Sequence, residues 1–140
     1  MWNEWCDAQR TTNTTQLNEQ EQQLHRWLPP RQGWLKCNVD AGFHNDGSIT
    51  SGGWCIRDDV GQFIHAGSYW LNGKYSILEA EALAILEAMK VVCNMNLEHV
   101  TFESDSQSVV AAIQANHVGV SNFSLLIASI KSLLILKYTF

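Results

Sequence analysis

Three acidic residues stand where their side chains could converge on one point. Asp40 lies on a predicted strand, Glu81 lies near the start of a predicted helix, and Asp105 ends a second predicted strand. Carboxylate oxygens suit Mg²⁺ or Mn²⁺, and carboxylates gathered at the edge of a sheet form an oxygen-rich pocket for such cations. Metal ions held in this way promote the hydrolysis of phosphodiesters. The three residues are therefore the first candidates for a metal-dependent site.

Each of the three also has a purely structural explanation. Asp40 precedes Ala41-Gly42, an ordinary turn sequence. Asp105 is a suitable N-cap for the helix that follows it. Glu81 could be a solvated residue on an amphipathic helix. Capping does not exclude metal binding, so the Asp105 alternative leaves the metal hypothesis open.

Two other glutamates of the same predicted helix compete with Glu81. Glu79 lies two residues earlier and points to a different face of the helix, and Glu87 lies further along it. The apolar run of residues 82–86 directly follows Glu81, as the helix packs down onto a core. This register favours Glu81 as the third ligand.

The elements that must position these residues follow from the hydrophobic pattern. Segments with alternating apolar residues predict strands, and segments with apolar residues at the helical period predict helices. Ala41-Gly42 and the polar run His44–Ser48 predict a turn after the first strand. In chain order we expect strands at 34–40, 49–57 and 62–70, a helix at 77–92, a strand at 97–104, helices at 106–115 and 122–134, and a strand at 135–140. This order predicts an α/β fold in which an antiparallel meander and parallel strands form one mixed sheet flanked by helices.

The N-terminal part of the chain differs in composition from the rest. Residues 1–32 are rich in Thr, Asn, Gln and Glu, and Pro29-Pro30 disfavours a helix across its end. With 140 residues and 46% hydrophobic residues in all, the chain has enough apolar material for one core. We predict a polar arm or linker at 1–32 and a single domain at 33–140.

Charge and composition limit the possible partners and locations. The chain has 9 basic and 14 acidic residues, a net charge of -5, which does not favour strong nonspecific attraction to nucleic acid. Contact with a polyanion must therefore be local or bridged by a metal. The four cysteines form no CxxC pair, so a zinc site is not predicted. No apolar run reaches the roughly 20 residues of a membrane helix, and the start of the chain does not read as a signal peptide. We expect an intracellular protein, cytoplasmic or nuclear, that is neither secreted nor bound in a membrane.

Four motifs in order resemble the ribonuclease H superfamily. They are Lys36–Gly42, Gly52–Asp58, Glu79–Ala84 and Glu103–Ser106. The resemblance covers about residues 33–140, and it is strongest to the reverse-transcriptase-associated RNase H-like domains (RNase H type 1) that are abundant in plant genomes. It implies a five-stranded RNase H-like sheet and a gene of retrotransposon origin.

The resemblance also implies an activity and roles for the acidic residues. The family hydrolyses the RNA strand of RNA/DNA hybrids endonucleolytically and binds nucleic acid. Asp40, Glu81 and Asp105 match three of the family's catalytic and metal-binding carboxylates, and Asp40 would be shared by two Mg²⁺ or Mn²⁺ ions. One ion activates the attacking water and the other stabilises the leaving 3′ oxygen.

A second set of residues matches the nucleic-acid-binding positions of the family. Gly42, Gly52 and Gly53 lie where the family brings its backbone close to the hybrid, and Ser106 could contact the nucleic-acid backbone. A bulge or close strand packing would also explain the glycines, and an ordinary first helical turn would explain Ser106.

The chain departs from the family pattern at its end. The family carries a fourth carboxylate on a C-terminal helix, and the sequence stops at Phe140 before such a helix. We therefore expect a C-terminally truncated domain without that helix, whose second cation is held weakly. The alternative is a catalytically incompetent or truncated module of retrotransposon origin that binds nucleic acid or an unknown protein partner. A 3′ to 5′ exonuclease of the same fold is less compatible, because Asp40 lacks the paired Asp-x-Glu of that class.

Overall fold

Three antiparallel strands form one half of the sheet in the computed structural model, which describes residues 27–115 and 119–140. They are β1 (Leu35–His44), β2 (Ile49–Arg57) and β3 (Phe63–Asn72). Strand β2 lies between the other two and pairs antiparallel with both. The predicted meander is confirmed, and the second strand has the predicted bounds.

Strand β1 is longer than its sequence pattern predicts. The turn predicted at Ala41-Gly42 is wrong, because β1 continues to pair with β2 as far as His44. The chain reverses at Asn45-Asp46-Gly47, whose φ angles are 49°, 55° and 85°. Gly, Asn and Asp tolerate the left-handed region best, so this tripeptide can supply the reversal while Ala41 stays extended.

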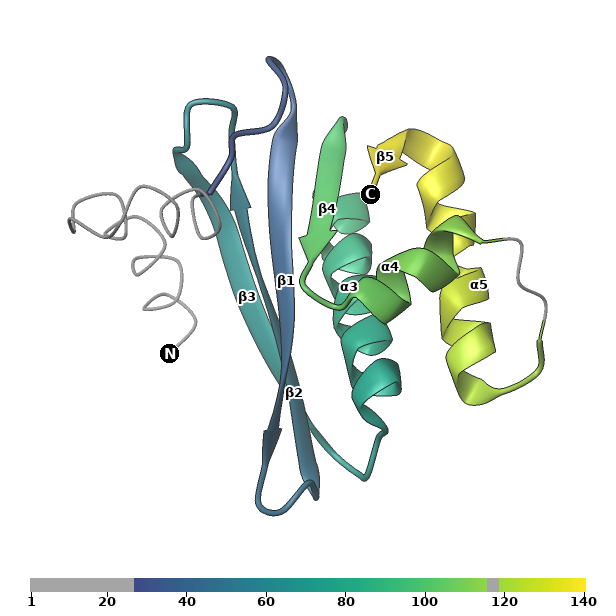
Figure 1. Cartoon of the computed structure of the whole chain (residues 1–140). Helices are drawn as coiled ribbons and strands as arrows, with labels where there is room; N and C mark the ends of the chain where they lie inside the picture. The colour runs from purple at the N-terminus through teal and green to yellow at the C-terminus, as the bar shows by residue number, and fades with distance from the viewer. Residues whose placement is uncertain (1–26, 116–118) are drawn as a thin grey trace, which may run out of the picture.

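Two parallel strands and three helices complete the fold. The helices are α3 (Ile77–Asn94), α4 (Gln107–Gln114) and α5 (Asn122–Lys137), and the strands are β4 (Val100–Ser104) and β5 (Tyr138–Thr139). The sheet order is β3-β2-β1-β4-β5, and β4 pairs parallel with both β1 and β5. The predicted mixed five-stranded sheet is confirmed, and the three helices lie together on one side of it (Figure 1).

The last predicted strand is mostly helix. It was expected to begin at Ile135, but α5 continues to Lys137 and leaves a strand of two residues. The apolar run of residues 133–136 fits either a buried helix or a buried strand, so its pattern alone could not place the boundary. In the described part of the chain, none of the helices is long and apolar enough to cross a bilayer.

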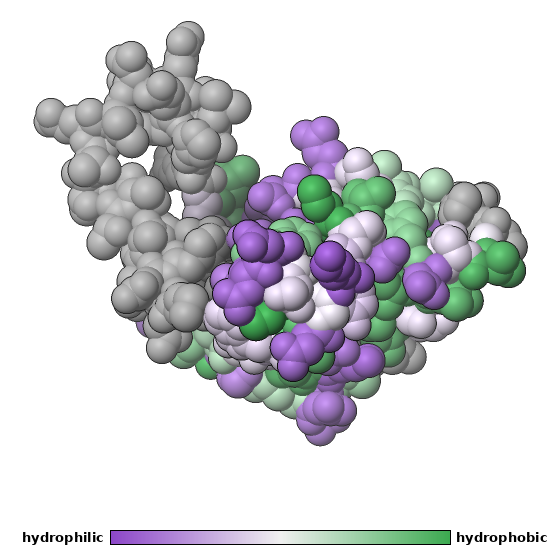
Figure 2. All heavy atoms as spheres, turned by 90° about the horizontal axis from the view of Figure 1, so that it is seen from below, coloured by the Kyte–Doolittle hydropathy of each residue, from purple (hydrophilic) through white to green (hydrophobic). Residues whose placement is uncertain are grey.

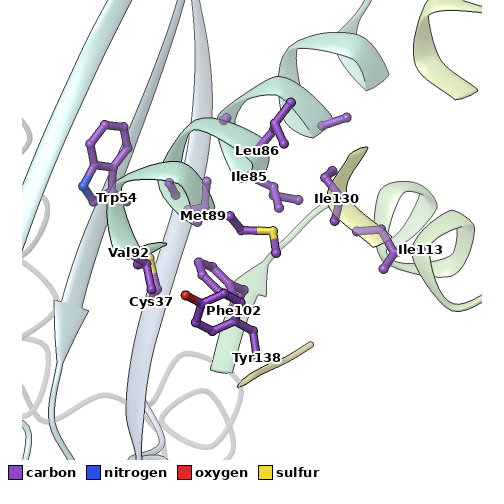
Figure 3. Packing of buried hydrophobic residues seen from close by; sticks show 14 of the residues in the cluster. Cys37, Trp54, Ile85, Leu86, Met89, Val92, Phe102, Ile113, Ile130 and Tyr138 are labelled. Carbon is purple, nitrogen blue, oxygen red and sulfur yellow. The ribbon is translucent and has the colours of Figure 1, made fainter. Parts of the chain in front are cut away.

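The core lies between the sheet and the three helices. Cys37 and Val39 of β1 alternate with polar residues and face the helices, together with Trp54 of β2 and Phe102 of β4. Figure 3 shows Ile85, Leu86, Met89 and Val92 of α3 among the labelled side chains of this cluster. The buried alanines of α3 have no side chain beyond Cβ and so allow the helix to approach the strands closely; they are Ala80, Ala82, Ala84 and Ala88.

The opposite face of the sheet carries buried polar residues. Lys36 and Asn38 of β1 are 8% and 9% exposed, and Arg57 of β2 is 3% exposed. Trp27 covers them: its Nε1 donates to Asn38 Oδ1 at 3.1 Å, and its ring lies 5.7 Å from Lys36 Nζ and 5.4 Å from Arg57 Cζ. Lys36 Nζ also donates to the Leu28 carbonyl oxygen at 2.7 Å. The segment that begins at Trp27 therefore packs on the sheet.

The division into an arm and a domain stays a prediction. Most of the arm predicted at 1–32 lies outside the described residues. At its end, Trp27 Nε1 donates to Asn38 Oδ1 of β1, and the Leu28 carbonyl oxygen accepts a hydrogen bond from Lys36 Nζ. These contacts attach the last residues of the predicted arm to the folded domain.

Candidate metal centre

The register between β1 and β4 places two of the three acidic residues side by side. Val39 pairs with Ser104 in the last step of the parallel ladder. The residues that follow these two in the chain are Asp40 of β1 and Asp105, which lies directly after the last residue of β4. Because β4 ends at this point, the edge of β1 that faces β4 is open from Asp40 onward. The two carboxylates therefore meet at the end of the ladder.

Helix α3 brings the third carboxylate. The helix begins after Ser76, whose hydroxyl accepts a hydrogen bond from Glu79 N at 3.1 Å. One turn later, the buried Ala80 and Ala82 hold the helix on the core and leave Glu81 half-buried between them. This local packing fixes the position of Glu81 relative to the strands.

The three predicted residues form one compact group. One carboxylate oxygen from each of Asp40, Glu81 and Asp105 lies within 4.8 Å of the others. Asp40 and Glu81 are half-buried and Asp105 is exposed, so the group is open on one side. The competing glutamates of α3 are not part of it, and Glu87 pairs with Lys90 at 3.0 Å. The structure thus distinguishes Glu81 from its neighbours.

Burial and mutual repulsion shift the pKa values in this group. Burial raises the pKa of Glu81 to about 7, and the charges of Asp40 and Asp105 add to the shift. Burial and then Asp105 also raise the pKa of Asp40, while the Ala41 amide lowers it by donating to Asp40 Oδ1 at 3.0 Å. Among the described residues, no Lys or Arg forms an ion pair with any of the three.

This donor set fits a hard divalent cation. Carboxylate oxygens are the ligands that Mg²⁺ and Mn²⁺ favour, and the group has no nitrogen or sulfur donor. A cation placed between the carboxylates would replace their repulsion with attraction and lower their pKa values. Asp40, Glu81 and Asp105 are the residues that could hold it.

The four residues predicted to contact nucleic acid lie close to this group in the fold. Gly53 pairs with Asp40 across β1 and β2, and Gly42 lies two residues further along β1. Ser106 follows Asp105 and occupies the N-cap position of α4 without a side-chain capping bond. Their contact with nucleic acid stays a prediction.

Gly52 has a clear packing role. A Cβ atom at this position would lie 2.4 Å from the ring of Tyr69, which pairs with Gly52 across β2 and β3. An aromatic ring placed over a cross-strand glycine is a known way to cover the exposed backbone. The predicted alternative of close strand packing therefore accounts for Gly52 without a ligand.

Tyr69 was not singled out from the sequence, although it lies near the acidic group. Burial raises the pKa of its hydroxyl, and the charges of Glu87 and Glu81 raise it further. The hydroxyl is therefore neutral at any ordinary pH. The signal that could have identified it is an aromatic residue opposite a glycine in the predicted hairpin.

The surface at the lower end of Figure 1, where the β1–β2 turn and the first turn of α3 lie, is mixed in character. Hydrophilic residues gather over its centre, and hydrophobic residues lie among them and toward one side (Figure 2). The described surface at this end is thus not a single apolar patch.

Comparison with known proteins gives one family and several relatives. The reverse transcriptase-like family matches residues 38–137. A protein of Arabidopsis thaliana named as a ribonuclease H protein is 27% identical over 89 residues, which are 63% of this chain and 14% of that protein. The chain thus spans about one seventh of the length of this curated relative.

Solved structures share the fold. The RNase H1 of the halophilic archaeon Halobacterium salinarum has a TM-score of 0.67 at 15% identity, over 76% of this chain and 83% of that chain. The RNase H1 called LC11, isolated from compost and solved in complex with an RNA/DNA hybrid, has a TM-score of 0.64 at 19% identity, over 76% and 82% of the two chains. At these identities the likeness concerns the fold.

Proposed function

We propose, from the premise that this chain belongs to the reverse transcriptase-like family of the ribonuclease H superfamily, that it hydrolyses the RNA strand of RNA/DNA hybrids. The observation that carries the proposal is the convergence of Asp40, Glu81 and Asp105 within 4.8 Å. The hybrid-bound LC11 enzyme, which shares the fold, supports this choice of substrate.

The chain's own residues would hold the metal and position the hybrid. Asp40, Glu81 and Asp105 would hold a Mg²⁺ or Mn²⁺ ion, whose chemistry would be the activation of a water molecule and the stabilisation of negative charge on the leaving oxygen. Asp40 accepts a hydrogen bond from the Ala41 amide, which fixes the orientation of its carboxylate. Glu81 must lose its proton before it can bind a cation, so its raised pKa makes metal binding depend on pH.

Nearby backbone groups supply the hybrid-binding surface in this proposal. Gly42 and Gly53 lack side chains on the strands next to Asp40, which allows a nucleic-acid strand to approach the sheet closely. The Ser106 hydroxyl follows Asp105 and is available for a phosphate or sugar oxygen. In this proposal the contacts belong to a domain of residues 33–140, which follows an arm of residues 1–32 in the sequence. The protein would be an intracellular plant protein of retrotransposon origin.

A second candidate function is binding without hydrolysis. The net charge of -5 opposes tight binding of a polyanion, and the metal group in the described residues has three carboxylates. With three ligands a second cation is held less firmly, which lowers turnover more than it lowers binding of the first cation. In this case the domain would bind a hybrid or a protein partner and leave it intact.

A cleavage assay separates the two functions. Purified chain is incubated with an end-labelled RNA/DNA hybrid in Mg²⁺ or Mn²⁺, beside Asp40→Asn and the matched control Glu79→Gln. Internal cleavage of the RNA by the wild type and by the control, and none by Asp40→Asn, supports hydrolysis. Equal background cleavage by all three proteins removes the enzymatic proposal, and retention of the hybrid on the protein then supports the binding function.

A further inference from the structure

Strand β3 is a long outer strand of the sheet, and within residues 27–115 and 119–140 it pairs only with β2. It is the outer strand of the order β3-β2-β1-β4-β5, has ten residues, and pairs on one side with β2. On its other side it faces no strand among the described residues. The opposite edge of the sheet is formed by β5, which has two residues. The open backbone groups of β3 can therefore accept another strand.

The sequence of β3 itself carries none of the charged or proline residues that usually protect an edge strand: it contains no Asp, Glu, Lys, Arg or Pro. A register shift between Ile56 and Arg57 places one extra β3 residue at Ile64, and the ladder is regular from His65 to Asn72. Large apolar side chains are exposed at both ends of the strand: Phe63, Ile64, Trp70 and Leu71, at 44%, 41%, 50% and 37%.

The sizes of the β3 side chains are distributed symmetrically on the two sides of Gly67 in the sequence. Reading outward from Gly67, the pairs are small with small, then ring with ring, then two pairs of large apolar residues. The pairs are Ala66 with Ser68, His65 with Tyr69, Ile64 with Trp70, and Phe63 with Leu71. An antiparallel strand pair with a two-fold axis at Gly67 would place the members of each pair opposite one another. In such a pair, a residue a given number of positions before Gly67 on one copy faces the residue the same number of positions after Gly67 on the other copy. Pairs of an aromatic and a β-branched residue are among the favourable cross-strand contacts.

We propose that β3 pairs antiparallel with β3 of a second copy of this chain, around a two-fold axis at Gly67. The pairing joins the two sheets into one continuous sheet. An uncharged strand lets two acidic chains meet without like charges at the contact, whereas a net charge of -5 would otherwise oppose self-association. This inference does not depend on the proposed hydrolytic function.

The geometry also limits the size and strength of the assembly. Each copy offers this edge once, and a two-fold contact uses it fully, so the assembly closes at a dimer. A single strand pair buries less surface than the roughly 1,200–2,000 Å² of stable complexes. We therefore expect a weak dimer with a dissociation constant in the micromolar range or above.

Sedimentation velocity of the full chain over a range of concentrations tests the dimer. Two variants at the exposed Ser68 test the register, because the two copies of residue 68 lie diagonally across the axis, about 7–8 Å apart. Ser68→Lys and Ser68→Glu should each weaken the dimer by about tenfold or more through like-charge repulsion. A mixture of the two variants should restore it, because the charges are then opposite.

The control places the same charge elsewhere. Leu125→Lys changes a 56% exposed residue of α5, far from β3 in the sequence, and should leave the dimer as it is. Circular dichroism checks that every variant is folded. A chain that stays monomeric at all concentrations, a dimer that Ser68→Lys does not weaken, or growth beyond the dimer would each overturn the proposal.

Discussion

The two halves of β1 differ in the surroundings of their charged side chains: the charge in the first half has a partner of opposite charge, and the charge in the second half lies beside like charges. In the first half, Lys36 is 8% exposed and is fully supplied with partners: it pairs with Glu103 at 2.8 Å and donates to the Leu28 carbonyl oxygen. In the second half, Asp40 lies beside Asp105 and Glu81, and the three carboxylates repel one another.

This difference indicates that the charge of Lys36 serves the fold, whereas the carboxylates beside Asp40 serve to bind a ligand. The partners of a buried ion offset the free-energy cost of taking it out of water, whereas clustered like charges destabilise the fold until a cation binds them. The raised pKa values of Asp40 and Glu81 are the physical sign of that cost. The comparison predicts that substitutions at the Lys36 end affect stability and those at the Asp40 end affect activity.

The largest effect is expected at the acidic end. Asp40→Asn should reduce metal-dependent cleavage of an RNA/DNA hybrid by about a thousandfold or more, about 4 kcal/mol of transition-state stabilisation. It should not lower the free energy of unfolding, because it relieves repulsion. Chemical denaturation beside the cleavage assay checks both. A strongly destabilised Asp40→Asn protein would break the comparison.

The next largest effect is expected at the opposite end. Lys36→Met should lower the free energy of unfolding by about 1–3 kcal/mol, because the Leu28 carbonyl loses its donor and Glu103 loses its partner. Lys90→Met is the matched control: its ion pair with Glu87 lies on the surface, where about 0.5 kcal/mol or less is expected. Equal losses for the two variants in urea denaturation would contradict the role given to Lys36.

A smaller loss is expected at the aromatic cover of the same end. Trp27→Phe keeps a ring near Lys36 and Arg57 but removes the Nε1 hydrogen bond to Asn38. Since Asn38 is 9% exposed, its oxygen then lacks a donor, at a cost of about 1 kcal/mol. Denaturation curves that superimpose on those of the wild type would show that Trp27 is not needed to hold the segment on the sheet.

The last prediction concerns a pH dependence at Glu81. Its pKa rises from 4.5 to about 7 on folding, so the folded state binds its proton more tightly than the unfolded state. In the absence of metal, this contribution to stability is complete below pH 4.5 and is lost as the pH rises toward 7. Glu81→Gln should flatten the slope in that window. Thermal melts from pH 4.5 to 8 in EDTA provide the measurement, and an unchanged slope would rule Glu81 out as its source.

The sequence predicted most of the sheet and the convergence of the carboxylates. Strand β2 and the start of α3 lie where the sequence places them, because Gly47-Ser48 and Asp58-Asp59 flank the strand and Ser76 caps the helix. The position of Asp40 beside Asp105 could also be predicted, since β4 follows helix α3 and pairs parallel with β1, so both strands run toward the same end of the sheet.

Two features besides the boundary between α5 and β5 could not be predicted from local patterns. Ala41-Gly42 has the composition of a turn, and only its pairing with β2 keeps it extended, which is a tertiary effect. The burial of Lys36, Asn38 and Arg57 depends on the segment at Trp27, whose polar surroundings in the sequence predicted an arm and gave no sign of a contact with the sheet.

Asp40 and Asp105 lie side by side because the residues before them, Val39 and Ser104, are paired in the sheet. This pairing limits where the chain can tolerate insertions and deletions. The turn at Asn45–Ser48 and the connection at 95–99 can change length without moving the end of the β1–β4 ladder. A single residue gained or lost between Val100 and Asp105 would shift Asp105 by one position and turn its side chain to the other face of the sheet. Length variation in related chains that keep the site should therefore be confined to the connections and absent from β4.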